Sequence, residues 1–241
     1  MVGDPVSGPG RPSAPPSPPD AVLFDLDGTL MDREPLMLES LRRAAADAGA
    51  PLGETEAAAY LGRAWQDVYD GLRIGDRTGL GFAEFLDRVV AWSEVLVADG
   101  HPMRVLEGGR ELIEALGAAG IAVGVVTGSL RREAEAALTH LGVLGQLDVF
   151  VPAEDYGPGK PAPDAYLLAA ERLGAAPHRC VVVEDSEPGI GAGIAAGMWV
   201  VGTAAANAPA GSPSHQDLSG ADVVLSGLDA PEAWAAVGGP G

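Results

Sequence analysis

Short runs of apolar residues alternate along most of the chain with longer segments in which apolar positions recur every three or four residues. The short runs predict buried strands, and the longer segments predict amphipathic helices that end mostly at a glycine. Strands are expected at 21–24, 121–126, 147–152, 180–183, 198–201 and 222–225. Helices are expected at 107–119, 130–141, 163–173 and 188–196, with one more after the last strand. This alternation is typical of βαβ units, so the expected fold class is α/β with a doubly wound parallel sheet.

Between the first two predicted strands the pattern is helical only. One helix is expected to start after Asp32 as its N-cap, with Pro35 in its first turn and Gly49 as its stop signal. Further helical patterns follow at 55–61, 64–74 and 82–99.

These patterns suggest three parts. Residues 1–19 hold seven of the twenty prolines and lack the basic and apolar regions of a secretory signal, so we expect a disordered Pro-rich tail. The helical block at 33–101 is inserted after the first strand and is expected to form a cap over the strand ends. Residues 20–32 and 102–236 are expected to form the core.

Composition narrows the possible partners. The formal net charge of −19 leaves no basic surface for nucleic acid or an anionic membrane. No apolar run approaches the roughly 18 residues of a membrane span. The single cysteine, Cys180, has no internal partner, which fits a reducing compartment and predicts a cytoplasmic location. The sequence carries no signal for an oligomeric state.

Polar residues follow four of the predicted strands. They are Asp25 and Asp27, then Thr127-Gly128-Ser129, then Lys160, and finally Glu184-Asp185. Lys160 is the only lysine in the sequence, which contains fourteen arginines. This suggests that its position requires the compact ammonium group of lysine and not the planar guanidinium of arginine. Because ligands in such sheets bind beyond the carboxyl ends of the strands, we expect these residues to form one site.

The residue types suggest phosphoryl transfer. A rigidly held carboxylate such as Asp25 can attack phosphorus and form an acyl phosphate, and the second carboxylate, Asp27, can donate a proton to the departing alcohol. Thr127 and the backbone amides of Gly128 and Ser129 are expected to bind the phosphate oxygens, which Lys160 neutralises.

Charge then calls for a metal. A phosphate dianion beside this many carboxylates meets repulsions of about 4 kcal/mol each at 4 Å and an effective dielectric constant near 20. Mg²⁺ would offset them, with the side chains of Asp25 and Asp185 and the carbonyl of Asp27 as expected ligands.

In these motifs the chain resembles the haloacid dehalogenase superfamily, in the branch with a helical cap that includes phosphoglycolate phosphatases and β-phosphoglucomutases. Asp25-x-Asp27-Gly-Thr matches its first motif, Thr127 its second, Lys160 its third and Glu184-Asp185 its fourth. The resemblance implies a Rossmann-like core and a nucleophilic Asp25, with Asp27 as general acid and base and Lys160 as a further catalytic residue. It also implies that Asp185 binds the metal, with Glu184 at or beside it.

The resemblance favours a Mg²⁺-dependent phosphatase for a small phosphorylated metabolite, such as a sugar phosphate or phosphoglycolate. Dehalogenase relatives lack the second aspartate, so Asp27 argues against that activity. Phosphonate-cleaving relatives use a cap lysine, which is missing here. A sugar-phosphate mutase remains the alternative, although Met37 stands where such relatives carry a histidine. A non-catalytic binding module is a third reading, which Asp25 and Asp27 disfavour.

Several other features have two readings. Gly159-Lys160 lacks the remaining residues of a P-loop. Gly191-x-Gly193-x-x-Ala196 matches a relaxed dinucleotide fingerprint but falls within a predicted helix, where close packing on the sheet explains it better. Five residues of the helical block either face a substrate or serve the block itself: Arg33, Glu34, Met37, Arg63 and Trp65.

Overall fold

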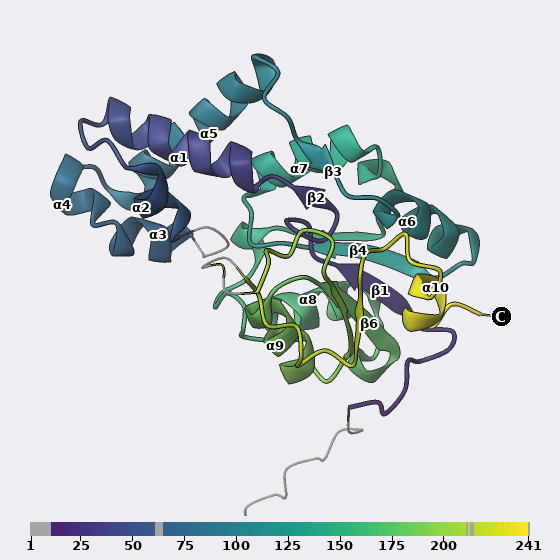
Figure 1. Ribbon diagram of the computed structural model, residues 1–241. Coiled ribbons are helices and arrows are strands. Elements are labelled where there is room, and N and C mark those ends of the chain that lie inside the picture. Colours follow the sequence, from purple (N-terminus) through teal and green to yellow (C-terminus); the bar gives the residue numbers. More distant parts are fainter. Residues whose placement is uncertain (1–10, 61–64, 211, 213–214, 241) are drawn as a thin grey trace, which may run out of the picture.

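The centre of the molecule is a six-stranded sheet with the strand order β5-β4-β1-β6-β7-β8, in which every neighbouring pair is parallel (Figure 1). The structure, a computed structural model, describes residues 11–60, 65–210, 212 and 215–240. The strands are β1 (Ala21–Phe24), β4 (Ala122–Val126), β5 (Val149–Val151), β6 (Cys180–Glu184), β7 (Trp199–Thr203) and β8 (Val223–Leu225). The predicted doubly wound α/β sheet is confirmed, with a strand at each of the six expected places.

Helices cover both faces of this sheet (Figure 1). One face carries α6 (Gly109–Ala118), α7 (Arg131–Leu141) and α10 (Ala233–Ala236), and the other carries α8 (Asp164–Leu173) and α9 (Glu187–Ala195). Single 3-10 turns are η1 (Leu144–Gln146), η2 (Ala153–Asp155) and η3 (Pro177–Arg179). In β1, Val22 and Phe24 enter the first layer while Ala21 and Leu23 enter the second, all fully buried. Burial on both faces explains why the strands are continuous apolar runs.

The helices inserted after β1 form a separate group at one end of the sheet (Figure 1). They are α1 (Glu34–Asp47), α2 (Glu54–Ala58), α3 (Trp65–Gly71), α4 (Ile74–Thr78) and α5 (Phe82–Ala98). They enclose their own apolar cluster, to which α1 contributes Leu41 and α5 contributes Phe85. The single helix expected at 64–74 is interrupted because Arg73 adopts a left-handed conformation with φ of 53°.

The start of α1 differs from the expectation. Asp32 does not cap the helix but lies in the short strand β2 (Met31–Asp32), which pairs antiparallel with β3 (Arg104–Val105). Arg33 occupies the N-cap position and makes no side-chain cap. The two chain segments that enter and leave the helical block are therefore tied together by a ribbon that local sequence signals do not reveal.

The predicted disordered tail lies partly outside the described residues, because 1–10 are not among them. Residues 11–19 contain no helix or strand. Arg11 donates from Nε to the carbonyl of Met198 at 3.1 Å and pairs with Asp222. Within the described part of the chain, no helix has the length and apolar character that crossing a membrane requires.

Candidate active site

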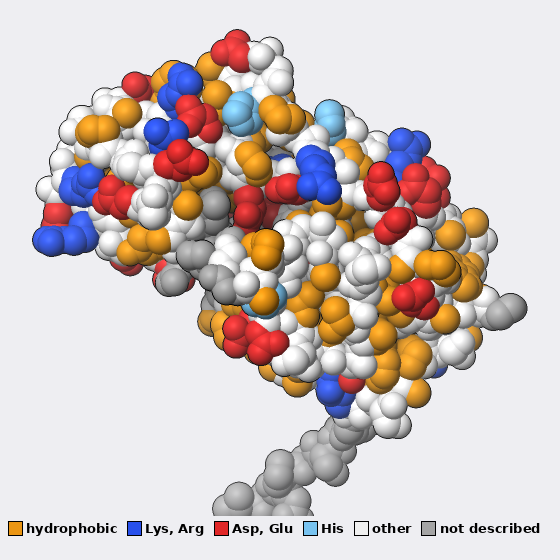
Figure 2. Space-filling view, in the orientation of Figure 1, with side chains coloured by type: hydrophobic (Ala, Val, Ile, Leu, Met, Phe, Trp, Pro, Cys, Tyr) orange, Lys and Arg blue, Asp and Glu red, His pale blue; other side chains and the backbone are white. Residues whose placement is uncertain are grey.

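Three central strands end together at one edge of the sheet. Phe24 of β1 is in register with Val125 of β4 and with Val183 of β6. The residues that follow, Asp25 after β1 and Thr127 after β4, therefore emerge side by side. Figure 2 shows acidic side chains in the hollow where this edge faces the inserted helices.

Lys160 reaches this edge from the loop between η2 and α8, and its ammonium group has three acceptors. Nζ donates to Asp25 Oδ1 at 2.5 Å, to Glu184 Oε1 at 2.6 Å and to the carbonyl of Val126 at 3.2 Å. The Lys160 side chain is only 12% exposed. A tetrahedral ammonium can serve three acceptors around one point, whereas the planar fork of arginine cannot, which accounts for the lone lysine.

Glu184 is fully buried, and donors surround its carboxylate. Besides Lys160, the hydroxyl of Tyr166 donates to Oε1 at 2.9 Å. Oε2 accepts from the backbone amides of Asp185 and Ser186, both at 3.1 Å, and from the Ser186 hydroxyl at 2.9 Å. With five donors on two oxygens, this carboxylate fixes both Lys160 and the loop that carries Asp185.

The turn after β1 closes tightly against Asp185. Gly28 has φ of +93°, and a Cβ atom there would lie 1.9 Å from Asp185 Oδ2. The hydroxyl of Thr29 donates to Asp185 Oδ1 at 3.4 Å. The glycine of the Asp-x-Asp-Gly-Thr motif is therefore required both by its backbone conformation and by the space that Asp185 occupies.

Asp25, Glu184 and Asp185 bring carboxylate oxygens within 4.8 Å of one another. Burial raises the pKa of Asp25 to about 7; Lys160 lowers it, and the charge of Glu184 raises it further. Burial also raises the pKa of Asp185 well above its ordinary range, and the charges of Asp25 and Glu184 add to this. Hard oxygen donors whose mutual repulsion disfavours ionisation fit a divalent cation, which would relieve that repulsion.

The carboxylate of Asp27 lies outside that cluster of three and is bound by Arg33. Nε and Nη2 of Arg33 donate to its two oxygens at 2.6 and 2.7 Å, and the hydroxyl of Ser129 donates to Oδ2 at 2.6 Å. Burial raises the pKa of Asp27, but the Arg33 guanidinium and the Ser129 hydroxyl outweigh burial and hold it below its ordinary value. Arg33 itself is only 3% exposed.

The segment after β4 offers polar groups at the same edge. Thr127 is buried, and its hydroxyl oxygen accepts from the backbone amide of Ser129 at 3.0 Å. Its carbonyl accepts from the hydroxyl of Tyr156 at 3.0 Å. Gly128 has open space beside it, since no atom lies within 4 Å of a Cβ placed there.

The structure thus brings the predicted site residues to one edge, although Asp27 turns to Arg33. Sequence reasoning missed the contacts of Arg33, Tyr166 and Tyr156. A cation at a helix N-terminus opposes the helix dipole, so Arg33 beside α1 was a usable signal. Nothing in the local sequence distinguishes Tyr166 from an ordinary core residue of α8.

The structure assigns a role to some of the remaining residues that the sequence left open. Trp65 packs against the apolar cluster of the inserted helices, and Arg63 lies outside the described residues. A Cβ at Gly193 would lie 2.8 Å from Val200, so this glycine permits close packing of α9 on the sheet. Cys180 is a buried free thiol whose pKa burial raises to about 12, which agrees with an inert core position.

Comparisons with known proteins agree with this architecture. The family model of haloacid dehalogenase-like hydrolases matches residues 19–197. Validoxylamine A 7'-phosphate phosphatase of Streptomyces hygroscopicus subsp. limoneus is 33% identical over 206 residues, which cover 86% of this chain and 92% of that protein. Hexitol phosphatase A of Escherichia coli (strain K12) is 36% identical over 207 residues, covering 86% and 90%.

A solved structure shows the same fold. CbbY from Rhodobacter sphaeroides in complex with phosphate superposes with a TM-score of 0.79 at 27% identity, covering 91% of this chain and 99% of that one. The family match spans β1 to α9 and includes all four polar segments at the sheet edge. The chain therefore belongs to the haloacid dehalogenase-like hydrolases.

Proposed function

We propose that this protein is a Mg²⁺-dependent phosphatase that hydrolyses a small phosphorylated metabolite, with Asp25 as its nucleophile. The observation that carries the proposal is the position of Asp25: at the end of a buried strand, with Oδ1 fixed by Lys160 at 2.5 Å. Within the described residues, Oδ2 of Asp25 has no hydrogen-bond partner. A carboxylate with one oxygen anchored and the other free is suited to attack on phosphorus.

In the first step, Asp25 attacks the phosphorus atom and the bond to the ester oxygen breaks, so the phosphoryl group passes to Asp25. The departing oxygen takes a proton from Asp27 and leaves as an alcohol. In the second step, Asp27 removes a proton from water, which attacks the aspartyl phosphate. Inorganic phosphate and the free carboxylate of Asp25 result.

The Arg33–Asp27 pair suits the second step better than the first. In this structure the pKa of Asp27 is low, which favours the form that accepts a proton from water. To donate a proton in the first step, Asp27 must part from the guanidinium of Arg33. The hydroxyl of Ser129 accepts a hydrogen bond from Arg33 and donates one to Asp27, so it lies between the two groups that would have to separate.

Asp25 and Asp185 are the proposed side-chain ligands of the metal, with the carbonyl of Asp27 as a third. A bound Mg²⁺ would supply positive charge to the phosphate oxygens and to the crowded carboxylates. Glu184 is committed to five donors, and we assign it mainly to holding Lys160 beside the metal site. Thr127, the amides of Gly128 and Ser129, and Lys160 would bind the transferring phosphoryl group.

We propose that the inserted block, residues 33–101, acts as a cap that selects the substrate. The two relatives named above are a validoxylamine A 7'-phosphate phosphatase and a hexitol phosphatase, and the second of these favours a polyol or sugar phosphate. The test is phosphate release from a panel of sugar phosphates, hexitol phosphates, phosphoglycolate and nucleoside monophosphates, each with Mg²⁺ and with EDTA. Metal-dependent hydrolysis of the polyol or sugar members is expected. Release that persists in EDTA, or a folded protein silent across the panel, would contradict the proposal.

A further inference from the structure

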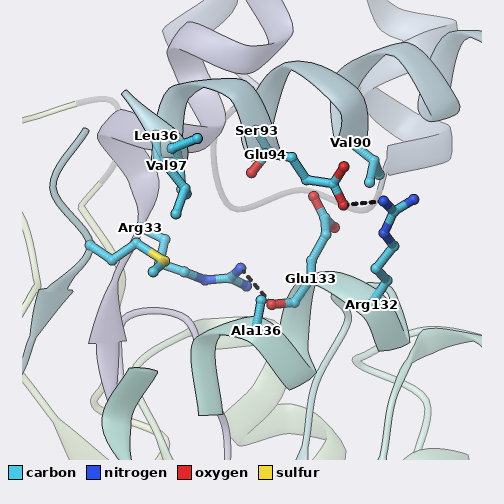
Figure 3. Close-up of a pocket in the computed structure, with 11 residues that line it drawn as sticks. Arg33, Leu36, Val90, Ser93, Glu94, Val97, Arg132, Glu133 and Ala136 are labelled. Carbon is cyan, nitrogen blue, oxygen red and sulfur yellow. Dashed lines mark hydrogen bonds and ion pairs between the residues drawn. The ribbon is translucent and has the colours of Figure 1, made fainter. Parts of the chain in front are cut away.

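A cavity of about 240 Å³ lies between the inserted helices and the core, apart from the acidic cluster of the sheet edge. Its volume is far above the roughly 10–15 Å³ that admits a single water. Helices α1 and α5 form one side and α7 the other (Figure 3). Much of its wall is apolar, formed by Leu36, Val90, Val97, Met103 and Ala136.

One buried acid faces this space. Glu133 of α7 is 8% exposed, and Figure 3 shows its side chain pointing from the helix into the cavity. The nearby backbone amide of Leu130 lowers the pKa of this carboxyl, but Oε2 has no hydrogen-bond partner within the described residues. Leaving such a group buried and unpaired costs about 1–3 kcal/mol.

The two cations of the cavity are already engaged. Arg33 donates to Asp27 twice, to Ser129 and to the backbone carbonyl of Glu133. Arg132 pairs with Glu94 across the cavity (Figure 3). No free positive charge remains in the lining to hold an anion, and the unmet requirement is for a hydrogen-bond donor.

We propose that this cavity binds a small primary amine with a compact apolar body. The ammonium group donates to the carboxylate of Glu133, and the apolar body covers the side chains of Leu36, Val90 and Met103. A purely apolar ligand would leave the Glu133 carboxylate unpaired.

Two other features agree with this ligand class. Burial raises the pKa of Glu133 to about 7, Arg33 lowers it and Asp27 raises it, so an adjacent ammonium would recover ionisation that burial opposes. The chain as a whole carries a net charge of −19, which attracts cations. Because α1, α5 and α7 all line the cavity, a bound amine would join the inserted helices to the core.

The test uses benzylamine as the probe and benzyl alcohol as its neutral counterpart of similar size. Thermal unfolding of the full chain is followed at pH 8 against increasing probe concentration, since a ligand that binds only the folded state raises Tm. We expect saturable stabilisation by benzylamine and at least about tenfold weaker binding of the alcohol. Equal effects of the two probes, or no effect of benzylamine, would overturn the proposal.

Three variants locate the site. Glu133→Gln keeps the side-chain size and should weaken benzylamine binding at least about tenfold. Glu135→Gln, on the same helix but outside the cavity and near Arg131 at 3.7 Å, should bind the probe as the native chain does. Ala136→Leu fills the cavity and should lose both probes. Unchanged binding to Glu133→Gln or to Ala136→Leu would place the amine elsewhere and reject the site. Phosphatase activity is not part of this readout, so the result is independent of the proposed function.

Discussion

Two buried glutamates show how differently this chain treats a carboxylate out of water. Glu184, at the end of β6, is fully buried and receives five hydrogen bonds from Lys160, Tyr166 and its own loop. Glu133, in α7, is 8% exposed and leaves Oε2 without a partner. The first carboxylate is fixed in one orientation, whereas the second is held in place but not satisfied.

The difference lies in the surroundings of each group. Around Glu184, β6, α8 and the start of α9 converge, and glycine at position 189 admits the carboxylate, since a Cβ there would lie 1.8 Å from Oε1. Around Glu133, helices from two parts of the molecule leave a cavity. A carboxylate with many hydrogen-bond donors, such as Glu184, forms a preorganised site. A carboxylate with few donors, such as Glu133, leaves hydrogen-bonding capacity that a ligand can satisfy.

The largest effect on turnover is expected at Asp25, the proposed nucleophile, which Lys160 links to Glu184. Asp25→Asn removes the nucleophile but keeps the side-chain size, and we expect phosphate release to fall by at least about 10³-fold. The measurement is Mg²⁺-dependent turnover of the best panel substrate, with circular dichroism as the control for folding. Retained turnover would exclude a covalent step on Asp25.

The next prediction concerns the ammonium that joins Asp25 to Glu184. Lys160→Arg keeps the charge but replaces three converging N–H groups by a planar fork, and we expect turnover to fall about 10²-fold or more. Arg172→Lys is the matched control, because Arg172 is exposed and pairs with Asp155 at 2.6 Å at the surface. Near-normal rates for Lys160→Arg would mean that charge alone suffices at this position.

The sheet edge could be predicted because strands and their ends are local features. Short apolar runs marked β1, β4 and β6, and parallel pairing brings the residues at their ends together. Asp25, Thr127 and Glu184 needed no further information to be placed in one site.

What escaped prediction depends on contacts between distant segments. Asp32 was expected to cap α1, but pairing with Arg104 of β3 draws it into a strand. The contact of Tyr166 with Glu184 depends on how α8 rotates against the sheet. Oε2 of Glu133 lacks a hydrogen-bond partner among the described residues because the side chains of α5 and α7 leave a cavity between the two helices.

A third prediction tests the close packing around Glu184. Gly189→Ala places a methyl group in the position of the carboxylate, so we expect a loss of about 2–4 kcal/mol in the free energy of unfolding. Gly117→Ala is the control, because nothing lies within 4 Å of a Cβ at this site in α6, and it should be neutral or gain up to about 1 kcal/mol. Urea unfolding measures both. If Gly189→Ala is as stable as Gly117→Ala, the Glu184 carboxylate can move without losing stability, and its five hydrogen bonds do not hold it rigidly.

The last prediction concerns Glu133, whose effect on stability depends on pH and shrinks toward zero near pH 5. Burial raises the pKa of this carboxyl from 4.5 to about 7 in the folded state, so between these values the folded chain binds more protons than the unfolded chain. Stability therefore falls as the pH rises from about 4.5 to 7, by up to about 3 kcal/mol from this group. Glu133→Gln removes that penalty and should be more stable than the native chain at pH 8, with the difference shrinking toward pH 5.

Glu135→Gln, measured by urea unfolding at the same pH values, separates this effect from the general loss of one negative charge. It should show a small difference from the native chain that changes little with pH, because Glu135 is half-exposed. A difference for Glu133→Gln that is equally flat would mean that Oε2 is satisfied in solution. The contrast between the two glutamates would then vanish, and the cavity would have no unmet donor requirement for an amine to fill.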